Sequence, residues 1–130
     1  MQPEIGLKDK LFNLNEAREL LLLVQTVTKV QEKQLAPVQD RLNKMLSNDP
    51  RRKVFERQYE MIVQQWCTKV ELLGARVSGL WMVEFDVGEG SLSWRFPELS
   101  LNHFRPNGAD FSERVKLRDY VEENDPDWAR

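Results

Sequence analysis

The sequence predicts an α+β fold in which a long antiparallel helical hairpin is followed by a three-stranded antiparallel β-meander. Upstream of Gly74, apolar residues recur every three or four positions, which is the spacing of one helix face. Between Gly79 and Leu117 the period changes to two, and the alternation continues on both sides of a glycine-bearing turn, as in a β-hairpin. We expect one domain over residues 1–118, with the hairpin over 13–74, the meander over 76–104, a turn and extended segment over 105–118, and then an acidic mobile tail over 119–130.

Length and composition fit one globular domain. The chain has 130 residues, 41% hydrophobic and 31% charged, which lies near globular averages. The net charge of -2 gives no positive field that would attract nucleic acid or an anionic membrane. The longest apolar run, Leu20 to Val24, is far shorter than the ~20 residues of a membrane helix, and residues 1–4 lack the features of a signal peptide. We therefore expect a cytoplasmic protein with neither nucleic acid nor membrane as a partner.

The first helix has a clear start signal and an internal proline. Asn13 can cap the free backbone N–H groups, and Glu16, three residues later, can complete a capping box. Pro37 lacks an N–H group and clashes with the preceding turn, so we expect a kink or a short break near Leu35 and Ala36. The stripe that faces the core is expected to contain Ala17, Leu21, Val24, Thr28, Gln31, Leu35, Val38, Leu42 and Met45.

The second helix is expected to begin at Pro50 with Asp49 as its cap, and to end at Gly74 in a left-handed conformation. Its apolar stripe should face the stripe of the first helix. This second stripe contains Phe55, Tyr59, Ile62, Trp66 and Leu73.

The first helix is apolar around more than a full turn between Leu20 and Val24. One partner helix covers only about a third to a half of that circumference. The β-hairpin or a second copy of the chain must cover the rest, and we expect both, with a homodimer as the oligomeric state. The expected interaction surface consists of Leu20, Leu22, Leu23, Val27 and Val30.

The strand half alternates between an apolar and a polar face. Gly88 and Gly90 supply the turn between the first two strands, and the alternation of Leu99, Leu101 and His103 suggests a third strand. We expect the polar face to be solvated. In the first two strands the apolar set is Trp81, Val83, Phe85, Leu92, Trp94 and Phe96, and the polar set is Glu84, Asp86, Ser91, Ser93 and Arg95.

Four residues of the strand half are the candidates for a polar site. Glu84, Asp86, Glu89 and His103 could together hold a divalent metal or perform acid–base chemistry. The interpretation that we favour is a solvated sheet face, since no ligand pair has a metal-binding helix spacing. The sequence contains neither a nucleophile elbow nor a phosphate-binding glycine loop, so we assign no catalytic residue and no cofactor.

Cys67 is the single cysteine, which rules out a disulfide within one chain and favours a buried hydrophobic role. The basic cluster Arg51, Arg52, Lys53 and Arg57 is weak as a nucleic-acid signal, because arginines at a helix start oppose the helix macrodipole and a solvated helix face is favoured.

Several motifs carry a family resemblance. They are the stretch Phe12–Leu21, the strand Val83–Asp86, the run from Gly88-Glu89-Gly90 to Trp94–Glu98, the pair His103-Phe104 and the stretch Gly108–Arg114. Together they resemble the prokaryotic family catalogued as domain of unknown function 2203, over roughly residues 11 to 117. Members commonly have Cys at the position of Ser93, and Trp or Tyr more often than Asn beside the His. The resemblance implies the fold and a prokaryotic cytoplasmic setting, and it carries over no catalytic residue.

We therefore expect a small cytoplasmic protein that associates with itself or with another protein through its long helices, rather than an enzyme. The alternative is a small-ligand or metal-binding domain, or an enzyme, that uses the carboxylate and histidine face of the meander.

Overall fold

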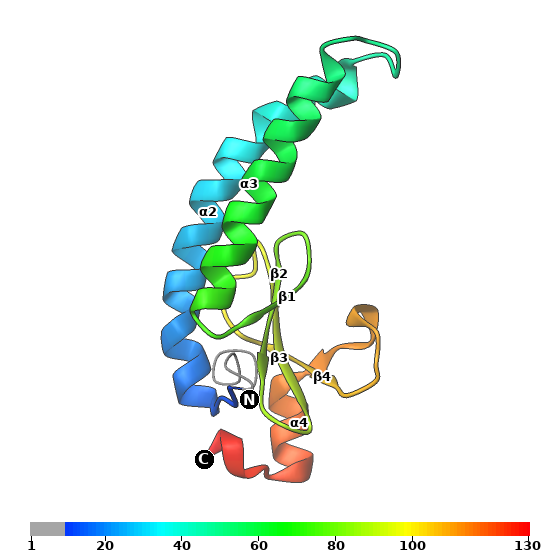
Figure 1. Ribbon diagram of the computed structural model, residues 1–130. Helices are drawn as coiled ribbons and strands as arrows, with labels where there is room; N and C mark the ends of the chain where they lie inside the picture. Colours follow the sequence, from blue (N-terminus) through cyan, green and yellow to red (C-terminus); the bar gives the residue numbers. More distant parts are fainter. Residues whose placement is uncertain (1–9) are drawn as a thin grey trace, which may run out of the picture.

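The computed structural model describes residues 10–130 and places a long helical hairpin beside an antiparallel sheet (Figure 1). Residues 1–4, on which the signal-peptide expectation rests, and the start of the expected domain lie outside the described residues. The helices are α2 (Leu14–Lys44), α3 (Arg52–Leu72) and α4 (Leu117–Asn124), with 3₁₀ turns η1 (Phe111–Glu113) and η2 (Asp127–Ala129). The sheet order is β1-β2-β3-β4-β5, comprising β1 (Arg76–Gly79), β2 (Met82–Asp86), β3 (Gly90–Arg95), β4 (His103–Pro106) and β5 (Val115–Lys116).

The start signal of α2 is confirmed. The Asn13 side chain accepts a hydrogen bond from the Glu16 N–H at 2.8 Å, and the Glu16 carboxylate accepts one from the Asn13 N–H at 2.9 Å. Downstream, α2 continues through Pro37 to Lys44 as one helix, so the expected break is absent and a kink stays a prediction. Within the part of the chain that the structure describes, no helix is long and apolar enough to cross a membrane.

The helices α2 and α3 pack side by side, as the two stripes predict. Trp66 on α3 donates a hydrogen bond from its indole N–H to the Thr28 hydroxyl on α2 at 2.8 Å, and neither residue has exposed surface. This bond explains how a polar residue is accommodated in the buried stripe. The start of α3 differs from the expectation, because Asp49 and Pro50 form a turn and the helix begins at Arg52. Gly74 ends the hairpin with a φ of +97°, as predicted.

The hairpin formed by β2 and β3 is confirmed. Glu84 pairs with Ser93 and Phe85 with Leu92 in the antiparallel register. The apolar residues Val83, Phe85, Leu92 and Trp94 are at most 1% exposed. Gly90 lies so close to β4 that an added Cβ would overlap the Phe104 ring and lie 2.5 Å from the carbonyl oxygen of Arg105. This position therefore requires a residue without a side chain.

The sheet has five strands, so the expectation of three was wrong. The expected third strand through Leu99 and Leu101 begins only at His103, because the chain turns first, with the Glu98 N–H donating to the Arg95 carbonyl at 2.8 Å. In the segment that we expected to be a turn and extended chain, β5 forms and pairs with β4, matching His103 with Lys116.

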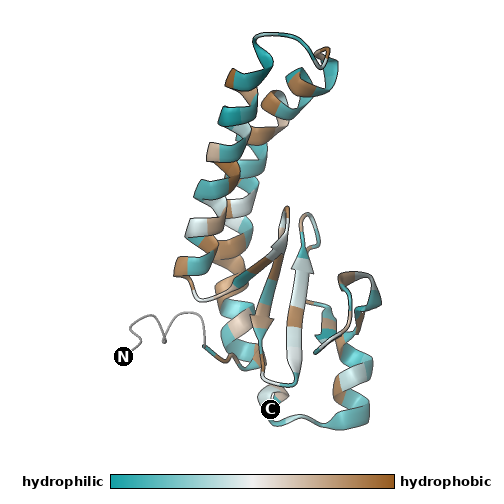
Figure 2. Ribbon diagram, turned by 45° about the vertical axis from the view of Figure 1, so that its right-hand side comes forward, coloured by the Kyte–Doolittle hydropathy of each residue, from teal (hydrophilic) through white to brown (hydrophobic). Residues whose placement is uncertain are grey.

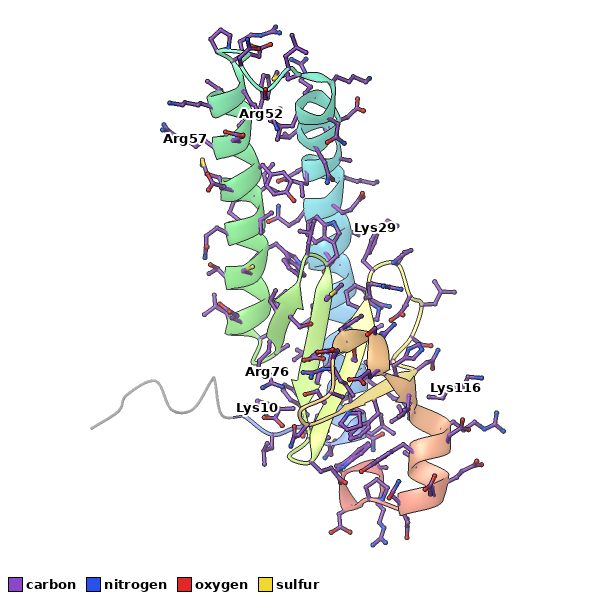
Figure 3. All side chains as sticks on the ribbon, turned by 90° about the vertical axis from the view of Figure 1, so that its right-hand side faces the viewer. Lys10, Lys29, Arg52, Arg57, Arg76 and Lys116 are labelled. Atoms are coloured by element: carbon purple, nitrogen blue, oxygen red, sulfur yellow. The ribbon has the colours of Figure 1, made fainter. Side chains whose placement is uncertain are left out.

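The middle of the polar face of the sheet is covered, which corrects the expectation of a solvated face, whereas Asp86 is partly exposed and Arg95 is exposed. Glu84, Ser91 and Ser93 are at most 2% exposed. The helical hairpin lies on one side of the sheet, and the segment between β4 and β5, which includes η1, lies on the other (Figures 1 and 3). Arg105 holds this segment, since its side chain pairs with Glu84 and also donates to the carbonyl of Ala109 at 2.6 Å.

Residues 119–130 are ordered against the sheet, in contrast to the mobile tail that their acidity suggested. Trp128 is 9% exposed and stacks on Phe104, with ring centroids 5.5 Å apart. The ring of Tyr120 on α4 also stacks on Phe104, at 3.9 Å. Glu89 in the β2–β3 turn accepts hydrogen bonds from the indole N–H of Trp128, at 2.7 Å, and from the hydroxyl of Tyr120. Aromatic burial thus fixes a segment whose composition is mainly polar.

Candidate functional site

The four residues suggested as a metal site have separate partners. Glu84 pairs with a guanidinium, and Asp86 accepts a hydrogen bond from the Gly88 N–H at 2.9 Å. Glu89 holds the C-terminal aromatic residues, and His103 lies on β4 with its Nδ1 atom buried. Within residues 10–130, no group of three or more His, Cys, Asp or Glu side chains could hold a metal ion. A metal site at these four residues therefore stays a prediction, since no set of metal ligands is brought together among residues 10–130.

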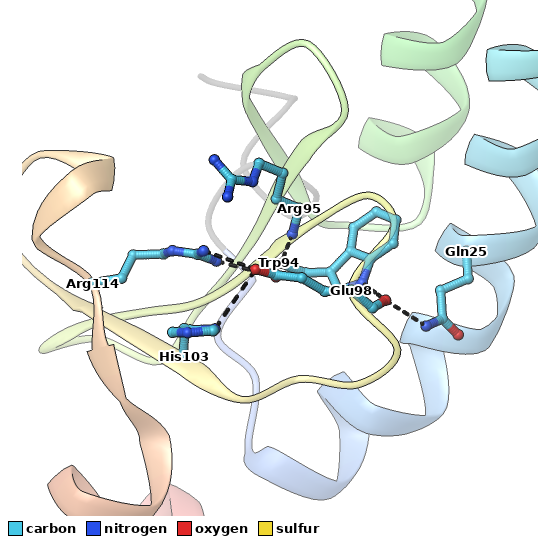
Figure 4. A network of polar contacts seen from close by, with 6 residues as sticks. All are labelled: Gln25, Trp94, Arg95, Glu98, His103 and Arg114. Atoms are coloured by element: carbon cyan, nitrogen blue, oxygen red, sulfur yellow. Dashed lines mark hydrogen bonds and ion pairs between the residues drawn. The ribbon is translucent and has the colours of Figure 1, made fainter.

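A polar network surrounds Glu98 in the loop between β3 and β4 (Figure 4). Its carboxylate accepts two hydrogen bonds from the Arg114 guanidinium, at 2.8 and 3.2 Å, and one from the backbone N–H of Arg95 at 2.8 Å. Its backbone carbonyl accepts a hydrogen bond from the Trp94 indole at 2.8 Å. Burial raises the pKa of the Glu98 carboxyl, but the hydrogen bonds that its carboxylate accepts from Arg114 and Arg95 outweigh burial, so the pKa is lowered. The carboxylate is therefore charged at neutral pH.

His103 borders this network. Its Nδ1 atom lies 3.9 Å from the Glu98 carboxylate, too far for a hydrogen bond. Burial lowers the pKa of His103 below its ordinary 6.5, and the nearby cations Arg114, Arg95 and Lys116 lower it further, against the opposing effect of Glu98. The imidazole is therefore neutral at pH 7. A neutral imidazole beside a carboxylate can accept a proton or donate a hydrogen bond to a ligand.

Two buried polar atoms of this region have no hydrogen-bond partner among residues 10–130. They are the hydroxyl oxygen of Ser93 and Nδ1 of His103, whose residues are directly opposite each other in the β3–β4 register. Sequence reasoning included His103 but missed Glu98 and Arg114. A glutamate in a loop and an arginine 16 residues later give no local signal that they will pair.

A cleft of about 660 Å³ lies where α2 begins, β4 begins and α4 passes over the edge of the sheet. Its apolar lining comes from Leu14, Leu101, Leu117 and Val121. Its charged lining is Arg18, Lys116, Arg118 and Glu122, with His103 beside them. The volume falls within the range of small-molecule sites, roughly 300–1,000 Å³. The cleft was not predicted from the sequence, because α4 forms one of its walls and most of α4 lies in the segment that was expected to be a mobile tail.

The outer surface of α2 carries exposed apolar side chains. Leu22, Leu23 and Val30 are 67%, 54% and 49% exposed, whereas Leu20 and Val27 are partly buried against the core. Hydrophobic residues recur along the length of both helices, beyond the part that lies against the sheet (Figure 2). We refer to the exposed set as the α2 outer face, which consists of Glu19, Leu22, Leu23, Thr26, Lys29, Val30 and Lys33.

Comparison with known proteins adds the family. A family model described as "Uncharacterized conserved protein (DUF2203)" matches residues 10–117, and the match confirms the resemblance seen in the sequence motifs. No curated protein and no solved structure matched the chain.

Proposed function

We propose that this chain, which belongs to the DUF2203 family, is a self-associating module that pairs with a second copy through the α2 outer face. The observation that carries the proposal is the exposure of Leu22, Leu23 and Val30 on a long helix whose opposite side is already buried. Apolar side chains gathered on one exposed helix face are typical of an association surface.

The geometry of α2 supports this separation of faces. At 3.6 residues per turn, Thr26 lies about 180° around the helix from Ala17 and from Leu35. Those two residues are at most 1% exposed. The α2 outer face therefore points directly away from the core, and it is accessible to a second helix along its length.

The sequence of this face is self-complementary in an antiparallel arrangement. A twofold axis at Thr26 places Leu22 opposite Val30 of the second copy, and Glu19 opposite Lys33. A parallel arrangement in register would instead place Glu19 against Glu19 and Lys33 against Lys33. Charges beside an apolar helix seam select the orientation of the partner, so the antiparallel arrangement is favoured.

The loop between β3 and β4 extends the apolar surface. Gln25, beside the α2 outer face, donates a hydrogen bond to the carbonyl of Leu99 at 3.0 Å. The side chain of Leu99 is 93% exposed. This leucine lies at the edge of the proposed interface, where a second α2 helix would cover part of it.

Light scattering on a size-exclusion column at micromolar concentration tests the association. We expect twice the 15.3 kDa chain mass, and the monomer mass for the double variant Leu22→Gln/Val30→Gln. The control is Val54→Gln on α3, which removes an apolar side chain that is 61% exposed and should leave the dimer intact. A monomer mass for the unmodified chain at every concentration would overturn the proposal.

Disulfide formation tests the antiparallel register in a Cys67→Ser background, which removes the single native thiol. Thr26→Cys lies on the proposed axis, so this variant should crosslink with itself. Glu19→Cys and Lys33→Cys should crosslink when mixed and fail to do so separately. Efficient self-crosslinking of Glu19→Cys would contradict the antiparallel register.

A further inference from the structure

We propose that the cleft between α2, β4 and α4 binds a small organic anion with an apolar body. The site is separate from the proposed association surface, and it draws its residues from segments that are about 100 positions apart in the sequence.

The lining supplies the apolar part of the site. Leu14, Leu101 and Leu117 are buried and form the floor, and Val121 on α4 is partly buried above them. A largely apolar concave surface of this size favours the body of a ligand over a hydrated ion.

The charges around the cleft select the sign of the ligand. The lining contains the three cations Arg18, Lys116 and Arg118 and the single carboxylate of Glu122, which gives a local excess of two positive charges in a chain of net charge -2. Within residues 10–130, none of these three cations forms an ion pair, unlike Arg105 and Arg114, which pair with Glu84 and Glu98. Cations that remain without ion pairs around an apolar cleft favour a carboxylate, phosphate or sulfonate group.

His103 adds a polar group at the same edge. It lines the cleft together with Lys116, and the two residues are directly opposite each other in the β4–β5 register. The imidazole can therefore donate a hydrogen bond to an anion that Lys116 attracts.

The test uses two probes that share one apolar body. 8-Anilinonaphthalene-1-sulfonate is the anion, and N-phenyl-1-naphthylamine is its analogue without the sulfonate. We expect saturable fluorescence enhancement with one anionic probe per chain, and affinity for the neutral probe lower by about tenfold or more. Equal affinity for the two probes would overturn the proposal, because the cations would then play no part.

Charge-removing variants locate the site. Lys116→Gln and Arg118→Gln should each weaken binding of the anionic probe by about tenfold, and both positions are exposed, so the fold should tolerate them. The matched control is Arg57→Gln, which removes a cation at the far end of the helical hairpin from Lys116 (Figure 3). An equal loss for Arg57→Gln would contradict a local site.

Backbone amide NMR separates this cleft from the association surface, which could also attract an apolar dye. The anionic probe should shift the resonances of Leu101, Leu117 and Val121. Shifts confined to residues 22–30 of α2 would overturn the proposal and would assign the dye to the α2 outer face. Light scattering of the Lys116→Gln and Arg118→Gln variants should give the same mass as the unmodified chain.

Discussion

The carboxylate of Glu84 on β2 reaches across β3 to Arg105 on β4 and accepts hydrogen bonds from both Nε and Nη2 of the guanidinium, the second at 2.6 Å. Glu84 is 2% exposed and the Arg105 side chain is 21% exposed, so the carboxylate of this bidentate pair is buried and its guanidinium is partly exposed. The pair joins the second strand to the fourth, and it helps to bury the middle of the polar face of the sheet.

Arg105→Met is expected to destabilise the protein by about 3–5 kcal/mol, because it leaves a buried carboxylate without its partner. The double variant Glu84→Gln/Arg105→Met should recover part of that loss, since an amide costs less to bury than a charge. Urea denaturation measures both, and Arg76→Met, at an exposed arginine that bonds Ser91, is the control. A loss for Arg105→Met no larger than that of the control would contradict a buried pair.

Tyr120 is expected to titrate at unusually high pH. Its hydrogen bond to the Glu89 carboxylate, together with burial, raises the pKa of Tyr120 to about 12 from an ordinary 10.0. Ultraviolet titration in a Tyr59→Phe background isolates this residue, since the chain has only two tyrosines. The Glu89→Gln variant should lower the tyrosine pKa toward its ordinary value.

The same hydrogen bond makes stability depend on alkaline pH. The folded-state pKa lies above the unfolded-state value, so the unfolded chain ionises first as the pH rises. The contribution of this bond is fully present below pH 10 and is lost as the pH rises from 10 to about 12. Denaturation at pH 9 and at pH 11.5 should show a smaller decrease in stability for Glu89→Gln than for the unmodified chain. An equal decrease in stability for the variant and the unmodified chain would contradict a contribution of this hydrogen bond to the pH dependence.

His103 is expected to titrate below its ordinary pKa of 6.5, because burial and then the positive charge of Arg114 disfavour the imidazolium. It is the single histidine, so its ring proton can be followed directly by NMR. Glu98→Gln should lower the pKa of His103 further by removing the neighbouring carboxylate, whereas Lys116→Gln should raise it by removing a cation. Since the unfolded chain binds the proton more readily, this histidine weakens folding as the pH falls below 6.5. A pKa for His103 above 6.5 would contradict its partly buried, cationic surroundings.

Gly90→Ala is expected to destabilise the protein by about 1–3 kcal/mol or more, because the new methyl group would overlap the ring of Phe104 and crowd the Arg105 carbonyl. Gly88→Ala is the comparison, since no atom lies within 4 Å of its added Cβ and only its φ of +102° opposes the substitution. Thermal or urea unfolding measures both variants. If Gly90→Ala lost less stability than Gly88→Ala, β3 and β4 would have to separate easily at this point.

The parts of the fold that the sequence predicted correctly depend on residues close together in the chain. The capping box joins Asn13 to Glu16 over three positions, and the hairpin of β2 and β3 follows from strict alternation around Gly88. Gly74 ends the helical hairpin where the period changes. Such features are visible in sequence because the interacting groups lie within one or two turns of each other.

The sequence alone determined that long helices and an antiparallel β-hairpin share one apolar core, and it predicted exposed leucines on the first helix. Only the tertiary structure decided which polar residues are buried and where a cleft forms. Glu84 meets Arg105 over 21 positions, and Trp128 meets Glu89 over 39. Polar and acidic residues indicate a solvated surface unless a distant partner neutralises them, and a local pattern carries no information about that partner.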